Sequence, residues 1–236
     1  MKNTIDLLNK KFENEPIEKT LAYFNQTYKE KMALATSFGA EDQVLTDLLL
    51  RQNPKAKIFT LDTGRLPEET YAVMDQTNKK YGIKIDVYFP NTADMEALYQ
   101  RQGIYGLRES IENRKMCCHV RKIAPLQRAL KGLDVWVTGL RRAQSQTRET
   151  MRLVEWDKAN ELIKLNLLIE WSEENVWNRI RENKLPYNAL HDLGYPSIGC
   201  APCTRAVKEG EDVRAGRWWW ENPEHKECGL HLRGGE

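Results

Sequence analysis

Residues 32–42, MALATSFGAED, decide the fold class of this chain. The first seven, MALATSF (32–38), form a short and mostly apolar run, which is typical of a strand buried on both faces. The run ends at Gly39, and a helix is predicted from Glu41 to Gln52. A buried strand, a glycine turn and a helix in this order form the repeating unit of an α/β sheet.

The same unit recurs along the chain. Four further strands are predicted, at KIFTLDT (57–63), 83–89, LDVWVTG (133–139) and LIKLNLLIEW (162–171). Helices are predicted over 3–30 with a break at Pro16, after Pro67, between the third and fourth strands, and over SEENVWNRIREN with Ser172 as its cap. The alternation predicts an α/β fold with a parallel sheet and helices on both faces.

Composition limits the classes of function. The 236 residues carry 36 Lys and Arg against 34 Asp and Glu, a net charge of +2, which does not indicate a nucleic-acid binder. No apolar run reaches the roughly 18 residues of a membrane span, and no signal peptide is visible, so a cytoplasmic protein is expected. We expect a nucleotide-binding α/β domain at 1–210 and a mobile C-terminal tail at 211–236. Whether the protein forms a homo-oligomer stays open.

Three strand ends carry loops suited to anions, namely SFGAED (37–42), LDTGRLPEET (61–70) and TGLRRAQSQTR (138–148). Parallel sheets bind ligands beyond the carboxyl ends of their strands, where glycine turns and helix starts present backbone N–H groups. The third loop adds Arg141, Arg142 and Arg148, whose guanidinium groups suit phosphate or sulfate. Which of the three contacts a ligand stays open. The loops predict a nucleotide site.

Four of the five cysteines form two pairs that indicate a metal site. Cys117 and Cys118 are adjacent in KMCCHVRK (115–122), and Cys200 and Cys203 form a CxxC pair. All-thiolate ligation suits zinc or an iron–sulfur cluster. Adjacent cysteines strain the chelation of one zinc ion, so a [4Fe–4S] cluster is favoured. Nearby Lys122 either balances the charge of such a cluster or reaches a substrate oxyanion, and both interpretations stay open.

The fifth cysteine, Cys228, lies in the polar segment KECGLHLRGGE, where an exposed thiol is available as a nucleophile. Upstream, VRAGRWWWEN (213–222) places Arg214 and Arg217 before three tryptophans. These arginines either accompany a hydrophobic anchor of the tail or bring positive charge to the nucleotide.

The strand-end loops resemble those of the adenine-nucleotide alpha-hydrolase superfamily, which has a Rossmann-like fold. SFGAED stands where that superfamily has an SGGxDS pyrophosphate loop, but Phe38 replaces the first glycine and Glu41-Asp42 replace the Asp-Ser end. The departure disfavours ATP pyrophosphatase chemistry.

KMCCHVRK, CAPC, VRAGRWWWEN and ECGLH together resemble the assimilatory, thioredoxin-dependent adenylyl-sulfate (adenosine 5′-phosphosulfate) reductases of the sulfonucleotide reductase family. The resemblance covers nearly the whole chain, from 37 to the ECGLH segment. It implies Cys228 as the nucleophile and a [4Fe–4S] cluster on Cys117, Cys118, Cys200 and Cys203. It further implies that the cationic residues around the phosphosulfate are Lys122, Arg148, Arg214 and Arg217. The strand-end residues around the adenosine would be Ser37, Gly39, Leu61 and Gly139. His231 would lie beside the nucleophile.

The resemblance also implies the reaction, in which adenylyl sulfate is reduced to sulfite and AMP during sulfate assimilation and cysteine biosynthesis. Attack of Cys228 on sulfur would give an enzyme S-sulfonate and AMP. A second thiol must then release sulfite, and the family implies that thioredoxin supplies it. One rival is the same reaction on 3′-phosphoadenylyl sulfate. The other is a non-catalytic, metal-binding nucleotide sensor.

Overall fold

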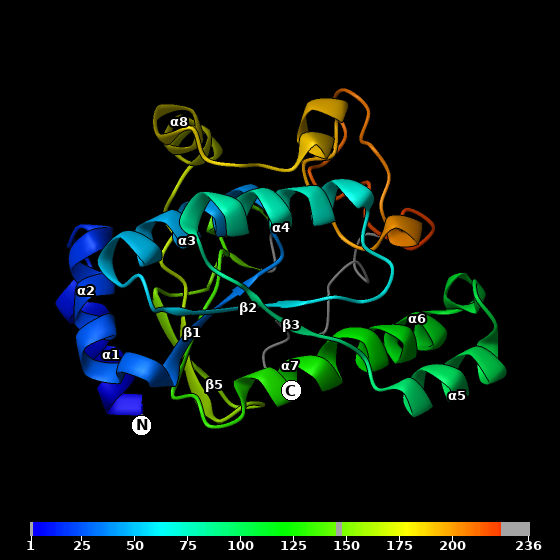
Figure 1. Ribbon diagram of the computed structural model, residues 1–236, viewed down its shortest axis with the longest axis horizontal. Coiled ribbons are helices and arrows are strands. Elements are labelled where there is room, and N and C mark those ends of the chain that lie inside the picture. The colour runs from blue at the N-terminus through cyan, green and yellow to red at the C-terminus, as the bar shows by residue number, and fades with distance from the viewer. Residues whose placement is uncertain (1, 145–147, 223–236) are drawn as a thin grey trace.

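A six-stranded sheet organises the structure, a computed structural model that describes residues 2–144 and 148–222 (Figure 1). The strand order is β3-β2-β1-β4-β6-β5, and every neighbouring pair is parallel except β5 with β6. The strands are β1 (Met32–Thr36), β2 (Lys57–Leu61), β3 (Asp86–Tyr88), β4 (Val135–Val137), β5 (Val154–Asp157) and β6 (Leu162–Leu165).

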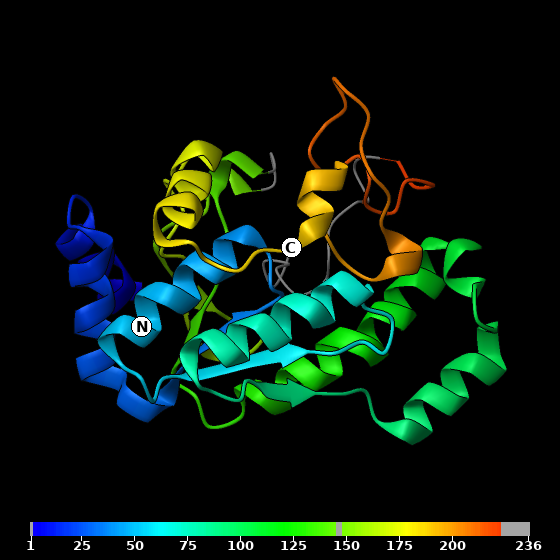
Figure 2. The same cartoon turned by 45° about the horizontal axis from the view of Figure 1, so that its top comes forward.

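Helices cover both faces of this sheet, and α3 and α4 lie on the side opposite to α7 in Figures 1 and 2. The helices are α1 (Lys2–Phe12), α2 (Ile17–Tyr28), α3 (Ala40–Gln52), α4 (Glu68–Tyr81), α5 (Thr92–Gln102), α6 (Ile111–Cys118), α7 (Ala124–Leu130) and α8 (Glu173–Asn183). The predicted cap of α8 is present, because Ser172 Oγ accepts a hydrogen bond from the Asn175 amide at 3.1 Å.

The alternating side chains of β1 build a core on each face. Met32 and Leu34 point into the larger core, which includes α1, α2, α3 and α8, while Ala33 points into the smaller one beneath α7. All three are almost fully buried. A strand buried on both faces needs an apolar residue at every position, and this explains why MALAT lacks the polar alternation of a surface strand. The predicted α/β class is confirmed.

The predicted fifth strand, 162–171, was too long, and a sixth strand was missed. β6 ends at Leu165 because Asn166 is fully buried as a turn anchor. Its side chain donates to the Arg152 carbonyl at 2.8 Å, and its Oδ1 accepts from Thr138 Oγ1 at 2.6 Å. β5 runs antiparallel along the outer edge of β6. Its sequence, VEWD, is too short and polar to stand out.

The strand order opens a crevice at one end of the sheet. β2 and β3 lie on one side of β1, whereas β4 lies on the other, so the chain leaves β1 and β4 in opposite directions. Loops diverge at such a switch point, and ligands bind there. Residues 203–205 pair with 216–218 beside this crevice, through a bridge between Thr204 and Arg217. Among the described residues, no helix has the length and apolar character to cross a bilayer.

Candidate functional site

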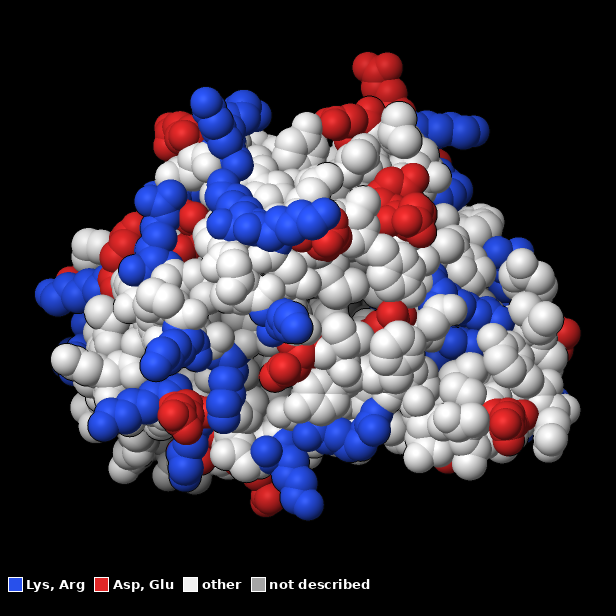
Figure 3. All heavy atoms as spheres, in the orientation of Figure 1, with Lys and Arg blue, Asp and Glu red and all other residues white. Residues whose placement is uncertain are grey.

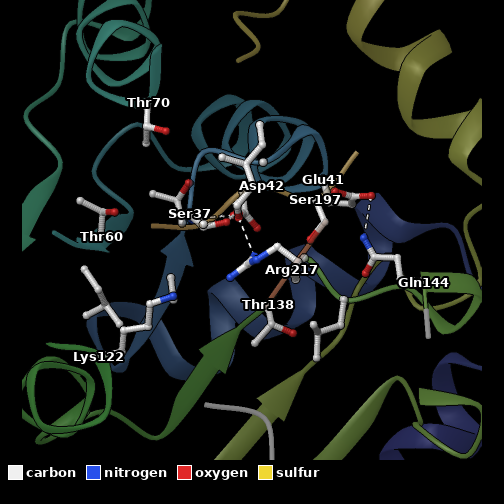
Figure 4. Close-up of a pocket in the computed structure, with 18 of the residues that line it drawn as sticks. Ser37, Glu41, Asp42, Thr60, Thr70, Lys122, Thr138, Gln144, Ser197 and Arg217 are labelled. Carbon is white, nitrogen blue, oxygen red and sulfur yellow. Dashed lines mark hydrogen bonds between the residues drawn. The ribbon is translucent and has the colours of Figure 1, made fainter. Parts of the chain in front are cut away.

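A cavity of about 240 Å³ lies at the carboxyl ends of β1, β2 and β4; we call it the rim cavity (Figure 4). Every predicted substrate-binding residue that the structure describes lines it, namely Ser37, Gly39, Leu61, Lys122, Gly139, Arg148, Arg214 and Arg217. These residues come from the end of β2, from the loops after β1 and β4, from the segment after α6 and from the C-terminal region. Their binding roles remain predictions. Cys228 and His231 lie outside the described residues.

The loop after β1 shapes one side of the rim cavity. Phe38 has a left-handed backbone with φ of 60°, which explains why related loops place glycine there. Its ring is buried, and its amide donates to Thr36 Oγ1 at 3.0 Å, so packing and this bond hold the strained residue in place. The turn delivers the amide and hydroxyl of Ser37 to Asp42 Oδ2, at 2.6 and 2.8 Å.

Asp42 is a buried carboxyl in the first turn of α3. Burial raises its pKa to about 6, although the two hydrogen bonds from Ser37 lower it. The loop after β4 passes so close that a Cβ on Gly139 would lie 2.4 Å from Asp42 Oδ1. Gly139 therefore has no room for a side chain, and the loops after β1 and β4 meet at this point.

The structure separates the three arginines of the loop after β4. Arg141 Nε pairs with Glu41 Oε1 at 2.7 Å, and Arg142 pairs with the exposed Glu170. Neither lines the rim cavity, whereas Arg148 does and is buried. Of the three, Arg148 is the one placed to contact a ligand.

Gln144 connects these groups. Its Nε2 donates to Glu41 Oε1 at 2.9 Å, and its Oε1 accepts from both the Arg141 amide and the Arg148 guanidinium. Both ends of the amide are thus used, which fixes its orientation. Gln144 lines the rim cavity but was not predicted, because a single glutamine in a loop carries no sequence signal.

Two cations from distant parts of the chain face the other side of the rim cavity. Lys122 lies in the π-helical segment His119–Ile123, and Arg217 forms the β-bridge with Thr204. In Figure 4 both side chains reach toward the same space. Arg217 is buried and donates to the Ile198 carbonyl at 3.0 Å. A Cβ on Gly199 would lie 2.2 Å from the Arg217 guanidinium, so any side chain at residue 199 would displace the end of Arg217.

A second, much smaller cavity of about 10 Å³ is lined by all four paired cysteines, Cys117, Cys118, Cys200 and Cys203; we call it the cysteine cavity. All four are free thiols and only Cys118 is partly exposed. Lys122, Arg217 and Trp218 line both cavities, so the two sites share a wall. In the part of the chain that the structure describes, no group of three or more His, Cys, Asp or Glu side chains is arranged to hold a metal ion.

The donor set and its surroundings nevertheless fit an anionic cluster. Four thiols meet at one cavity, and its wall carries five cations, Arg65, Arg114, Arg121, Lys122 and Arg217. Burial tends to raise the pKa of Cys200, but Lys122, the hydrogen bond with Thr63 and Arg217 together lower it. Burial and the neighbouring Cys200 raise the pKa of Cys203 to about 11. Cations of this number beside buried thiols suit four thiolates bound to iron.

His191 is a further rim-cavity residue that the sequence did not reveal. It lies in a 3-10 helix, Ala189–Leu193, which begins where Asn188 Oδ1 accepts from the Leu190 amide at 3.0 Å. Burial lowers the pKa of His191, and its ring packs edge-on against Trp177 at 5.2 Å. The neutral imidazole is therefore a hydrogen-bonding group at neutral pH. It was missed because it stands in the irregular region after 187.

The chain is similar to known reductases over most of its length. The family model for the phosphoadenosine phosphosulfate reductase domain matches residues 31–206. Adenosine 5′-phosphosulfate reductase from Allochromatium vinosum is 54% identical over 204 residues, which cover 86% of this chain and 80% of that protein. The protein of the same name from Agrobacterium fabrum is 47% identical over 206 residues, covering 87% and 79%.

Solved structures agree on the fold. Phosphoadenylyl-sulfate reductase from Candida auris, a phosphate complex, superposes with a TM-score of 0.75 at 28% identity, covering 88% of this chain and 98% of that one. An NH3-dependent NAD synthetase from Campylobacter jejuni shares the fold alone, with a TM-score of 0.52 at 9% identity over 81% and 78% of the two chains. The adenine-nucleotide alpha-hydrolase-like fold is thereby confirmed. This chain is an enzyme of the phosphoadenosine phosphosulfate reductase family, in the branch of the adenosine 5′-phosphosulfate reductases.

Proposed function

We propose that this enzyme reduces adenosine 5′-phosphosulfate to sulfite and AMP as a step of sulfate assimilation that leads to cysteine. One observation carries the proposal: all eight described candidates for substrate binding line the rim cavity, and two of its cations, Lys122 and Arg217, also line the cysteine cavity. The relatives named for this substrate support the choice.

The rim cavity offers two environments for the two halves of this substrate. The adenosine would lie against the loops after β1, β2 and β4, where Ser37, Leu61 and Gly139 form the wall. The phosphosulfate would lie among Lys122, Arg148 and Arg217, with Arg214 beside them. Cations fixed before the reaction stabilise the charge on the leaving phosphate, and they also reduce the repulsion of an approaching thiolate.

The nucleophile of the proposed reaction is Cys228. Its thiolate forms a bond to the sulfonate sulfur while the sulfur–oxygen bond to the phosphate breaks, and AMP leaves with the electron pair. A thioredoxin thiolate then attacks the sulfur of Cys228 and expels sulfite. The second thioredoxin thiol reduces the mixed disulfide, so the dithiol loses two electrons and Cys228 returns to its thiol form. In this scheme Cys228 reacts first with the nucleotide and then with thioredoxin.

The proposed cofactor is a [4Fe–4S] cluster held by Cys117, Cys118, Cys200 and Cys203. When bound, the cluster supplies a fixed charge beside the substrate cavity. Lys122 and Arg217 lie on the wall between the two cavities, and they orient the phosphosulfate oxyanions there. The four free thiols support a reducing compartment, and the proposed compartment is the cytoplasm.

A single turnover without reductant tests the reaction. The anaerobic enzyme is mixed with adenosine 5′-phosphosulfate, and separately with its 3′-phosphorylated form, and AMP release and intact mass are followed. One sulfonate on Cys228 with the first nucleotide alone supports the proposal. An adduct with both would make the specificity wrong. No adduct with either, in protein that holds its iron, would overturn the reaction and favour a nucleotide sensor.

A variant separates the nucleophile from the binding site. Cys228→Ser should bind the nucleotide and retain iron, yet form no adduct. Cys203→Ser should lose iron and acid-labile sulfide while keeping Cys228. If Cys228→Ser still forms the adduct on another residue, Cys228 is not the nucleophile.

A further inference from the structure

A group of exposed aromatic and apolar side chains lies beside the cysteine cavity, outside both cavities except for Arg65. We define the α5–α6 ledge by Arg65, Tyr99, Ile104, Tyr105, Arg108 and Trp219. Ile104 and Tyr105 are 61% and 60% exposed, which is unusual for side chains of their size. Figures 1 and 2 both show α5 and α6 as a lobe that projects beyond the end of the sheet.

Two arginines tie the ledge into one surface. The Arg65 guanidinium lies 5.5 Å from the Tyr99 ring centre and 5.9 Å from that of Tyr105. The Arg108 guanidinium lies 5.2 Å from the ring centres of both Tyr105 and Trp219. Each of the three aromatic rings of the ledge therefore lies next to at least one guanidinium group. The ledge joins the loop after β2, the α5–α6 connection and the C-terminal region.

The ledge is also held rigid. Arg65 donates to the Ile104 carbonyl at 2.6 Å, and Arg108 donates to the Pro202 carbonyl at 2.9 Å. These bonds fix the arginines and thereby the rings that they cover. A surface that is already ordered loses little entropy when a partner binds. Tyrosine, tryptophan and arginine are also the residues that carry most binding energy in protein interfaces.

The length of chain between Asn222 and Cys228 limits where a protein that reacts with Cys228 can bind. Glu221 donates its amide to the Trp218 carbonyl at 2.9 Å, so the chain turns directly after Trp219 and is described up to Asn222. Cys228 follows six residues later, and six residues span at most about 20 Å. A protein that attacks the sulfur of Cys228 must therefore come within about 20 Å of Asn222, and Trp219 of the ledge is only three residues away from Asn222.

We propose that the α5–α6 ledge is the docking surface for the thioredoxin-type dithiol protein that releases sulfite from Cys228. This inference rests on the proposed function, because it needs the S-sulfonate and an external thiol. The exposed rings provide the apolar contact, and the two arginines favour a partner whose contact face carries carboxylates or backbone carbonyls. The surface of this lobe is largely uncharged in the view of Figure 3, with basic side chains gathered at its inner side.

The test separates the two half-reactions. The enzyme is first converted to its Cys228 S-sulfonate, and sulfite release is then started either with thioredoxin below saturation or with dithiothreitol. The variants are Ile104→Ser combined with Tyr105→Ser, and Arg108→Glu. The matched control is Leu7→Ser, an equally exposed apolar residue (68%) on α1, at the opposite end of the molecule.

The ledge variants should form the S-sulfonate like the wild type and react normally with dithiothreitol, but release sulfite about tenfold more slowly with thioredoxin. Leu7→Ser should match the wild type in all three assays. An unchanged thioredoxin rate in both ledge variants would overturn the proposal. The proposal would also be overturned if the wild type were a dimer and the double variant a monomer with an unchanged thioredoxin rate. A second copy of the chain would then cover the ledge. Failure of the wild type to form the S-sulfonate would instead overturn the proposed function.

Discussion

Arg141 neutralises Glu41 at the edge of the rim cavity, through an ion pair of 2.7 Å in which both side chains are largely buried. A bare carboxylate there would repel an anionic ligand. Gln144 then joins this pair to Arg148 by hydrogen bonds alone. Because glutamine is neutral, it orients Arg148 without cancelling its charge. Arg148 lines the rim cavity, and the proposed function assigns it to a phosphosulfate oxygen.

Replacement of Gln144 by glutamate tests this role. The new carboxylate would lie against Glu41 and form an ion pair with Arg148, so it would withdraw positive charge from the cavity. We expect the Kd for adenosine 5′-phosphosulfate, measured by calorimetry in the Cys228→Ser background, to rise about tenfold or more. Arg142→Gln, in the same turn but paired with the exposed Glu170, should leave the Kd unchanged. An unaltered Kd in Gln144→Glu would show that Arg148 is positioned by other groups.

Asp42 gives a prediction about pH. Burial raises its pKa from 3.8 to about 6 in the folded chain, so the folded state holds this proton more tightly than the unfolded state does. The contribution of Asp42 to the free energy of unfolding therefore falls as the pH rises from about 4 through 6. Above pH 6 the buried carboxylate lowers the free energy of unfolding by at most about 3 kcal/mol. Asp42→Asn should accordingly raise the Tm relative to the wild type at pH 8, and this difference should shrink toward pH 4.

The control for this variant is Asp75→Asn, because the Asp75 side chain on α4 is mostly exposed and its substitution should change the Tm only slightly. Asparagine can still accept the two hydrogen bonds from Ser37, so the comparison isolates the charge. If Asp42→Asn destabilises the enzyme equally at both pH values, Asp42 is ionised in the fold throughout.

Gly199 controls the position of Arg217. A Cβ at residue 199 would lie 2.2 Å from the end of the Arg217 side chain, which is flexible and can move away. Gly199→Ala should therefore fold with a nearly unchanged Tm but bind the nucleotide about as weakly as Arg217→Ala does. In a double-mutant cycle the two changes should be far from additive, since both remove the same contact. Additive losses would mean that Gly199 acts through a different group.

The sequence predicted the parts of this enzyme that local patterns encode. The apolar runs at β1 and β4 and the glycines that end them predicted the parallel sheet and the edge where the candidate residues meet. Each of these two runs is too short for a typical helix and is followed by a glycine, and these two features distinguish a buried strand from a buried helix segment. The adjacent cysteine pair and the CxxC pair likewise predicted that four thiols would converge, and these four thiols line one cavity.

Other features depend on contacts that no local pattern records. β5 exists because it pairs with β6, and β6 ends because Asn166 finds one partner in β5 and another directly after β4. The choice of Arg148 over Arg141 follows from the position of Glu41, 100 residues away. His191 and Gln144 enter the rim cavity from short 3-10 helices, which are too short for periodicity to give information. Each of these features depends on tertiary contacts rather than on local propensity.

The last prediction concerns stability at the wall of the cysteine cavity. Arg114 of α6 pairs with Glu221 at 2.7 Å, and the two side chains are only 2% and 4% exposed. The Arg114 guanidinium also lies 4.8 Å from the ring centre of Trp218. The pair thus fastens the end of the described chain to the helix that carries Cys117 and Cys118. Glu221→Gln would leave a buried cation without its counterion and should lower the free energy of unfolding by about 3 kcal/mol.

A matched exposed pair provides the comparison. Arg152 and Asp6 are also 2.7 Å apart, but both side chains are about half exposed, so Asp6→Asn should cost less than about 1 kcal/mol. Urea unfolding of both variants, in protein with and without iron, measures the difference. Arg114→Met combined with Glu221→Met should recover part of the loss, because an apolar pair leaves no buried charge. Equal effects of Glu221→Gln and Asp6→Asn would mean that water reaches Arg114 and that the pair does not fasten the C-terminal region to α6.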